Sequence, residues 1–350
     1  MRRLFIAGLA VVALGTSSAS ASPDPVATLQ ASIKSAVTTK SAPSALKPPL
    51  AEWGPGYWWS HYSLANNPAY RACFGDAATA TPLPTACSVF GDRRSEHRAF
   101  LVGDSRAFQW LPALHVWGQT RHWRVSALTK ANCRPWTNTA YFSGAPGQPT
   151  GAPYPSCTSF NKGVLNAIKA QRPSYVFVTA MRGRTGTSSF ETNTQIRIGM
   201  VGFARAVQQL GAVVVFLGPN PEWFASSGLR ADIFPPDCVV HNLSSVAHCV
   251  GVGATANGRA GVIEAGYFNA MTDAARATSS IYLPTPDLFC IRNYALSATA
   301  PNAAAYGACP LLVAGTLAYL DRQHITREYA QLIGAAFATL ADRSIIPPPA

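Results

Sequence analysis

Two short groups of residues, far apart in the chain, together offer the chemistry of nucleophilic catalysis. Near residue 100, an apolar run leads directly into Gly103-Asp104-Ser105, and near the other end Asp321-Arg322-Gln323-His324 places a carboxylate three residues before an imidazole. A serine hydroxyl is a weak nucleophile unless a base removes its proton, and a histidine oriented by a carboxylate is such a base. The pattern predicts Ser105 as nucleophile, His324 as general base and then acid, and Asp321 as the residue that orients His324.

Each group also has a simpler explanation when taken alone. A Gly-Asp-Ser sequence often forms a turn that caps a helix, and an Asp-x-x-His pair commonly lies on a surface. Ligands bind at the carboxyl ends of the strands in a parallel sheet. If both groups lie there in one sheet, each strengthens the catalytic interpretation of the other. Asp104 is expected to shape the turn and is assigned no proton transfer.

The elements between the two groups alternate strand and helix. Short apolar runs typical of strands buried on both faces occupy 99–102, 123–128, 175–179, 213–217 and 281–283. Helical periodicity occupies 107–117, 160–171, 196–210, 260–277 and 326–341. This order predicts an α/β fold, a three-layer α/β/α sandwich around a doubly wound parallel sheet.

The amino terminus has the organisation of a secretory signal peptide, residues 1–21. Arg2 and Arg3 precede an apolar stretch of about a dozen residues, which is too short to cross a bilayer, and small residues at 19–21 suit cleavage. The alternative is an uncleaved membrane anchor. Export places the protein outside the cytoplasm, secreted or in the cell envelope.

Two further segments precede the catalytic domain, which is assigned to residues 98–345. Residues 22–50, rich in Ala, Ser, Pro and Thr, are interpreted as a linker or loosely docked arm with one helix at 26–37. Residues 51–97 form an aromatic, disulfide-containing lead-in. Its aromatic residues could stack on a sugar, although capping a core is the more common role; they are Trp53, Tyr57, Trp58, Trp59 and Tyr62.

An even number of cysteines in an exported chain indicates disulfides. The eight are Cys73, Cys87, Cys133, Cys157, Cys238, Cys249, Cys290 and Cys309. They allow 105 pairings, of which pairing between sequence neighbours closes the shortest loops and is favoured: 73–87, 133–157, 238–249 and 290–309. Cys238 and Cys249, with His241 and His248, could instead ligate zinc, but a disulfide-closed loop is preferred. No metal and no cofactor are expected.

Composition and charge limit the function further. Hydrophobic residues make up 48% of the chain, which excludes disorder over most of its length. The net charge is +12, or +10 without the two arginines of the signal peptide, and this favours contact with anionic envelope surfaces. Lysine and arginine are scattered with no run longer than two, which disfavours nucleic acid as a partner.

The two catalytic groups resemble those of the SGNH (GDSL-type) hydrolase superfamily. Residues 100–114 and 128–133, with the pair Cys73 and Cys87, resemble more closely the SGNH domain fused to bacterial acyltransferase-3 membrane proteins, and the likeness covers about residues 70–340. The resemblance implies a flavodoxin-like fold. It also implies a Ser–His–Asp site that handles acyl esters, often acetyl groups on envelope carbohydrates.

The resemblance also implies an oxyanion hole in which a glycine and an asparagine assist the serine N–H. Here the loop at 129–132 lacks the glycine, the loop at 180–183 lacks the asparagine, and Arg106 stands where the fused domains more often have histidine. The candidate oxyanion donors are Ser105, Arg182, Gly183 and Asn132. Loss of one such donor costs about 10²–10³ in rate, so slow or transferase-biased chemistry is expected.

The sequence thus predicts an exported serine esterase or O-acyltransferase. Its substrate would be an acylated, foremost acetylated, envelope glycan or glycolipid, and a separate membrane acyltransferase is a candidate partner because this chain carries no such domain. The alternative is a non-catalytic module that keeps the fold and binds an envelope polymer through its basic surface and aromatic residues.

Overall fold

The computed structural model describes residues 23–53, 70, 73–136, 151–183, 189–223, 234–252, 259–291 and 308–345. The predicted signal peptide and four of the five aromatic residues of the lead-in, Tyr57, Trp58, Trp59 and Tyr62, lie outside these ranges. The fifth, Trp53, is buried, and its indole N–H donates to the carbonyl of Pro48 over 3.0 Å.

The predicted apolar runs form the parallel strands of one sheet. They are β3 (Arg98–Gly103), β4 (Arg124–Lys130), β5 (Tyr175–Thr179), β6 (Val213–Leu217) and β8 (Ile281–Leu283). Their spatial order is β4-β3-β5-β6-β8, with every neighbouring pair parallel. Numbered along the chain this is 2-1-3-4-5, the flavodoxin-like order, so the predicted doubly wound sheet is confirmed.

Two very short strands lengthen the β4 edge, giving seven strands in this sheet within the described residues. β1 (Phe74–Gly75) pairs parallel with the end of β4, and β2 (Phe90–Gly91) pairs antiparallel with its start. The sequence analysis did not predict them. Strands of two residues carry no periodicity that could be recognised.

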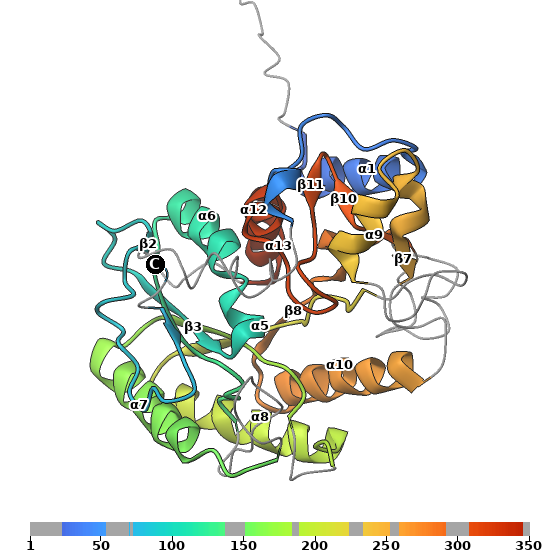
Figure 1. Ribbon diagram of the computed structural model, residues 1–350. Coiled ribbons are helices and arrows are strands. Elements are labelled where there is room, and N and C mark those ends of the chain that lie inside the picture. Colours follow the sequence, from blue (N-terminus) through green and yellow to red (C-terminus); the bar gives the residue numbers. More distant parts are fainter. Residues whose placement is uncertain are drawn as a thin grey trace, which may run out of the picture.

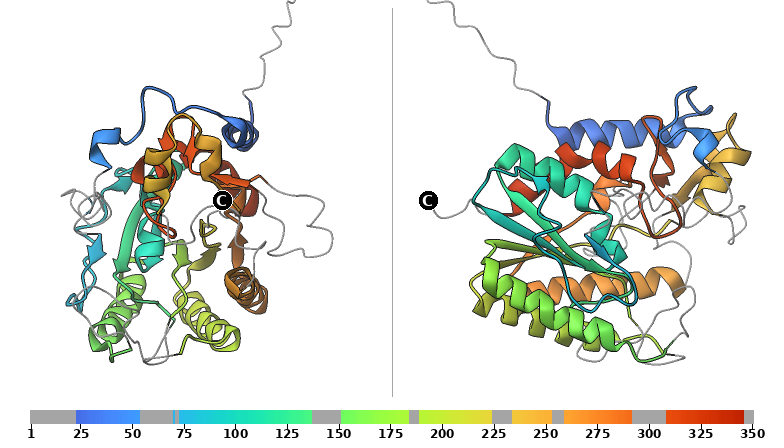
Figure 2. Two further views of the ribbon diagram at one scale, coloured as in Figure 1. Left: turned by 45° about the vertical axis from the view of Figure 1, so that its right-hand side comes forward. Right: turned by 60° about the vertical axis from the view of Figure 1, so that its left-hand side comes forward.

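Helices cover both faces of the sheet, as Figures 1 and 2 show. On one face lie α6 (Leu111–Arg121), α12 (Arg327–Leu332) and α13 (Gly334–Ser344). On the other lie α7 (Pro155–Gln171), α8 (Asn193–Gln209) and α10 (Arg259–Ala277). Successive strand residues point to opposite faces, so Leu101 belongs to the first core and Val102 to the second. The predicted three-layer α/β/α sandwich is present.

Two helices that the sequence predicts as continuous are each divided. In place of 107–117 the chain forms α5 (Ser105–Phe108) and then α6, and in place of 326–341 it forms α12 and then α13. Pro112, near the start of α6, has no N–H to bond to the preceding turn. At the second break, a Cβ on Gly334 would lie 2.7 Å from the Val116 side chain, so glycine permits close packing of α13 on α6.

The segment 22–50 contains its predicted helix, α1 (Pro25–Thr38). Leu29, Ile33 and Ala36 are buried in the same core as α6 and α13, so this helix is docked through an apolar face. The remaining short elements are η1 (Leu50–Glu52), α9 (Pro235–His241), η2 (Val246–Cys249), η3 (Pro286–Leu288), and the antiparallel pairs β7 (Val250–Val252) with β9 (Ala308–Pro310) and β10 (Leu312–Val313) with β11 (Thr316–Leu317).

All eight cysteines are paired, and each is bonded to its neighbour in the sequence. The bridges are Cys73–Cys87, Cys133–Cys157, Cys238–Cys249 and Cys290–Cys309. The favoured pairing is therefore confirmed, and Cys238 and Cys249 are not available as zinc-binding thiolates. Within the described ranges, no helix combines the length and the apolar character needed to cross a bilayer.

Candidate active site

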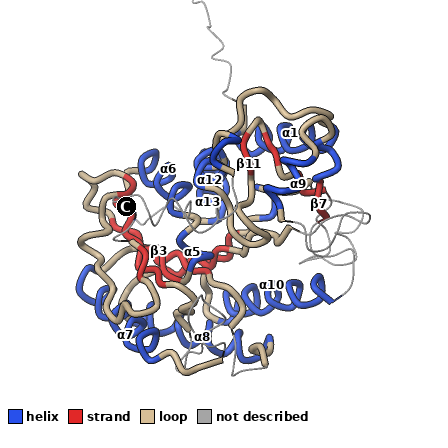
Figure 3. Tube along the Cα trace, in the orientation of Figure 1, coloured by secondary structure: helices blue, strands red, loops and turns tan. Residues whose placement is uncertain are grey.

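Ser105 is the first residue of α5. Figure 3 shows β3 leading into α5 at the carboxyl edge of the sheet. The turn requires glycine at 103, because its φ is +147° and a Cβ would lie 1.9 Å from the Thr179 carbonyl oxygen of the neighbouring strand. The chain order reverses between β4 and β5 on either side of β3. Such a reversal is where open α/β sheets bind their ligands.

Asp104 fastens this turn. Its buried carboxylate accepts from the Arg106 N–H over 2.8 Å and from the Met181 N–H over 2.9 Å, so it caps α5 and ties it to the loop after β5. Burial raises the pKa of Asp104, against the opposing effect of these hydrogen bonds and of nearby positive charge. These contacts agree with a role in shaping the turn.

The structure brings Ser105, His324 and Asp321 into one hydrogen-bonded row. His324 Nε2 lies 2.9 Å from Ser105 Oγ, across 219 positions of sequence, and Nδ1 lies 2.7 Å from Asp321 Oδ2. With the Nδ1 proton donated to Asp321, the Nε2 lone pair faces the serine hydroxyl. This is the arrangement in which an imidazole can take the serine proton.

Asp321 holds its own loop as well as the imidazole. Its Oδ1 accepts from the backbone N–H groups of Gln323, over 2.6 Å, and His324, over 2.7 Å. Burial alone would raise the pKa of Asp321, but the charge of His324, its ring hydrogen bond and the two backbone bonds together lower it. The carboxylate therefore stays ionised and can stabilise an imidazolium.

A buried polar network lies behind the histidine loop. The Arg106 guanidinium donates to Asn220 Oδ1 over 3.1 Å and to the Gln323 carbonyl over 3.0 Å, and it pairs with Glu222. Gln109 joins the same network through Asn220. The sequence analysis assigned no function to Gln109, Asn220 or Glu222. The usable signal was Asn220, a polar residue between two prolines, three positions after the end of β6 at the edge of the sheet that carries Ser105.

Two of the proposed oxyanion donors have other partners. The Gly183 N–H donates to Glu191 Oε2 over 3.3 Å, and the Arg182 guanidinium donates to the Glu191 carbonyl over 2.8 Å and to Asn193. Asn132 lies in the turn after β4 with a left-handed backbone, φ 53°. Ser105 is the first residue of α5, so its backbone N–H remains the candidate oxyanion donor that the turn geometry favours.

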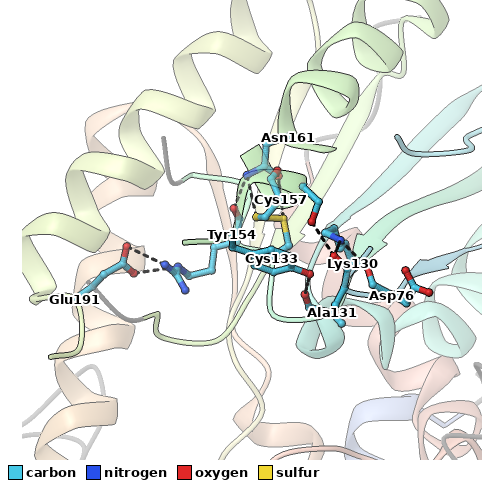
Figure 4. The surroundings of a disulfide bond; sticks show 11 residues. Asp76, Lys130, Ala131, Cys133, Tyr154, Cys157, Asn161 and Glu191 are labelled. Carbon is cyan, nitrogen blue, oxygen red and sulfur yellow. Dashed lines mark hydrogen bonds and ion pairs between the residues drawn. A yellow bond between two sulfur atoms is a disulfide. The ribbon is translucent and has the colours of Figure 1, made fainter. Parts of the chain in front are cut away.

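The loops after β4 and β5 are fixed by buried charges and a disulfide, shown in Figure 4. Arg134 pairs with Glu191 over 3.2 Å, next to Cys133–Cys157. Lys130 is fully buried: its ammonium donates to the Ala77 carbonyl over 2.9 Å and lies 4.7 Å from the centre of the Tyr154 ring. Burial lowers the pKa of Lys130 to about 8.

Comparison with known proteins gives one family match and several structural likenesses. The model of the SGNH domain (fused to AT3 domains) matches residues 72–339. The periplasmic domain of a lipopolysaccharide acetyltransferase from Salmonella ser. Paratyphi A is 16% identical with a TM-score of 0.52, covering 79% of this chain and 93% of that one. At this identity the likeness concerns the fold.

Two further structures are more distant. A putative SGNH hydrolase from Slackia heliotrinireducens is 13% identical with a TM-score of 0.36, covering 69% of this chain and 97% of that one. A GDSL-like lipase from Bacteroides thetaiotaomicron is 11% identical with a TM-score of 0.33, covering 77% and 93%. No curated protein matches the chain.

Proposed function

The chain belongs to the SGNH domain family, described as fused to AT3 domains, and we propose that it is a serine esterase or O-acyltransferase with Ser105, His324 and Asp321 as its catalytic residues. The observation that carries this proposal is the hydrogen-bonded row in which His324 contacts Ser105 over 2.9 Å and Asp321 over 2.7 Å. This row supplies a hydroxyl, an imidazole and a carboxylate in the order that acyl transfer through a serine nucleophile needs.

In the first half of the reaction, Ser105 Oγ attacks the carbonyl carbon of the ester as its proton moves to His324 Nε2. Negative charge develops on the carbonyl oxygen, and the Ser105 N–H at the start of α5 is the proposed donor for it. The C–O bond then breaks, the departing alcohol takes the proton from Nε2, and the acyl group remains on Ser105 as an ester.

In the second half, a water molecule or a sugar hydroxyl gives its proton to His324 Nε2 and attacks the acyl carbon. Collapse of the intermediate breaks the bond to Ser105 Oγ, which recovers its proton from the imidazolium. Water yields a carboxylic acid and hydrolysis, whereas a sugar hydroxyl yields a new ester and net transfer. Asp321 stabilises the imidazolium in both halves.

The substrate class proposed for this site is an acylated, foremost acetylated, glycan or glycolipid of the cell envelope. It is supported by the family description and by the Salmonella domain, whose own enzyme is named as a lipopolysaccharide acetyltransferase. The net charge of +12, or +10 without the two arginines of the proposed signal peptide, favours approach to anionic envelope surfaces. We further propose that the protein is exported through residues 1–21 and that a separate membrane acyltransferase supplies acyl groups if transfer is its activity.

Hydrolysis of 4-nitrophenyl acetate by the wild type and by Ser105→Ala tests the proposal. The variant removes only the nucleophilic oxygen, so we expect turnover to fall by about 10³-fold or more, while thermal unfolding stays close to that of the wild type. A fluorophosphonate probe should label the wild type at Ser105 alone. Turnover retained by the variant would refute the assignment. Absence of labelling, with binding to wall polymer, would favour the non-catalytic module.

A further inference from the structure

The backbone on both sides of His324 is held by two buried amide side chains. The Ile325 N–H donates to Gln109 Oε1 over 2.8 Å, and Asn220 Nδ2 donates to the Gln323 carbonyl over 2.9 Å. Gln109 Nε2 in turn donates to Asn220 Oδ1 over 2.7 Å. The three hydrogen bonds form one chain that runs from the residue after His324, through both amides, to the residue before it.

The two amides come from elements that are already fixed. Gln109 directly follows α5, four residues after Ser105, and it is 1% exposed. Asn220 follows β6 and is fully buried. The histidine loop is therefore attached to the same short helix that carries the nucleophile and to the carboxyl edge of the sheet.

We propose that Gln109 and Asn220 are positioning residues that set the distance between His324 Nε2 and Ser105 Oγ. This inference rests on the proposed catalytic function of that pair. Neither amide contacts a reacting atom: both act through the backbone of the histidine loop. A displacement of about 1 Å in such a pair can cost about 10²-fold in rate.

The orientation of each amide is determined by its partners. Arg106 also donates to Asn220 Oδ1, so that atom must be the oxygen, and the amide nitrogen must face the Gln323 carbonyl. Gln109 is fixed in the same way, because its oxygen receives the Ile325 N–H and its nitrogen reaches Asn220. A substitute side chain at 109 or 220 that lacks the amide donor or acceptor interrupts this series of hydrogen bonds. A buried polar group of the histidine loop or of the other amide then has no hydrogen-bond partner.

The first test replaces Gln109 by Met, which keeps the length of the side chain and removes both of its hydrogen bonds. We expect kcat per fluorophosphonate-reactive site to fall by about 10- to 100-fold, with KM changed less than about twofold. Gln109→Glu keeps the acceptor for Ile325 and should recover part of the loss. Asn220→Leu interrupts the same series of hydrogen bonds as Gln109→Met. The kcat of the double variant should therefore be little lower than that of the less active single variant.

The matched control is Gln208→Met in α8. The Gln208 amide donates to the Thr278 carbonyl over 2.7 Å on the opposite face of the sheet, so its loss should lower stability and leave kcat unchanged. If Gln109→Met behaves like Gln208→Met, with a lower melting temperature and an unchanged kcat per reactive site, the positioning role is refuted.

A readout without turnover separates this proposal from the proposed function. In the wild type, Ser105→Ala should shift the ¹⁵N signal of His324 Nε2, because that nitrogen loses its hydrogen-bond partner. In the Gln109→Met background, the same substitution should produce little shift, because the contact is already lost. A full shift in that background would overturn the inference even if no ester is ever hydrolysed.

Discussion

Asp321 makes three hydrogen bonds within the histidine loop. One carboxylate accepts two backbone N–H groups of its own loop and the Nδ1–H of His324, and these contacts outweigh burial in setting its lowered pKa. The imidazole is thereby held in one tautomer and one orientation before any substrate arrives. The row of contacts is complete in the protein alone, so the proposed chemistry needs no rearrangement to assemble it.

Asp321→Asn tests this reasoning. The asparagine amide fills the same space, and its oxygen is needed to accept the two backbone N–H groups of the loop. Its nitrogen then faces His324 Nδ1 and cannot accept a proton from it. The tautomer of His324 that can receive the serine proton is therefore no longer favoured. We expect kcat for 4-nitrophenyl acetate to fall by about 10²–10⁴-fold with little change in melting temperature. A variant with activity within about twofold of the wild type would show that Asp321 does not orient the base.

Lys130 gives a prediction for the pH dependence of stability. The pKa of Lys130 is about 8 in the folded protein, below the ordinary lysine value of 10.5 that applies in the unfolded chain, because burial disfavours the charged ammonium. Between these values the unfolded chain binds more protons, so the free energy of unfolding must rise with pH. The rise due to this residue is at most about 3.4 kcal/mol.

Urea unfolding of the wild type and Lys130→Met at pH 8 and pH 10.5 measures this contribution. The wild type should gain more stability across this interval than the variant, whatever their absolute stabilities. Equal changes in the two proteins would mean that Lys130 keeps an ordinary pKa despite its burial.

The three proposed catalytic residues could be recognised from sequence because their signals are local. Gly103-Asp104-Ser105 is one turn, and Asp321 lies three residues from His324. Gln109 and Asn220 could not be found in this way, since they bond to backbone more than 100 positions distant. The partners of Arg182 and Gly183 were equally hidden, because nothing local indicates that Glu191 folds back onto this loop.

At the scale of elements, the five longer parallel strands of the main sheet were more predictable than the helix ends. A strand buried on both faces favours a continuous apolar run, and each of β3, β5, β6 and β8 has one, whereas Ser126 interrupts the run of β4. The spacing of apolar residues is the same whether a helix is continuous or interrupted for one turn, so it does not show where a helix divides into two. Pro112 near the start of α6 is visible in the sequence, but the contact of Gly334 with Val116 at the start of α13 is a tertiary one that the sequence does not reveal.

A pair of glycine substitutions tests the packing of α13 on α6. Gly334→Ala would place its Cβ 2.7 Å from the branched side chain of Val116, and we expect this overpacking to cost about 1–3 kcal/mol of unfolding free energy. Gly202→Ala in α8 meets no atom within 4 Å and should instead stabilise the protein by about 0.5–1 kcal/mol. Urea unfolding of both variants is the measurement, and destabilisation by Gly202→Ala or none by Gly334→Ala would contradict the packing.

Over the whole molecule, the topology brings the two proposed catalytic groups together. The strand order places the turn after β3 in the middle of the sheet, and the segment after β11 carries the histidine back to that same edge. The alternation of strands and helices was sufficient to predict the layers, and the short loops were sufficient to favour the disulfide pairing. The meeting of Ser105 and His324 could only be expected from the sheet as a whole, because 219 positions separate them.

Trapping of the acyl-enzyme is the most direct test of this arrangement. The protein would be mixed with 4-nitrophenyl acetate, quenched in acid within the first turnover and digested for mass spectrometry. We predict one added acetyl group on the peptide that contains Ser105, absent in Ser105→Ala and greatly reduced in His324→Ala. An acetyl group on another residue, or none during measurable hydrolysis, would contradict nucleophilic catalysis by Ser105.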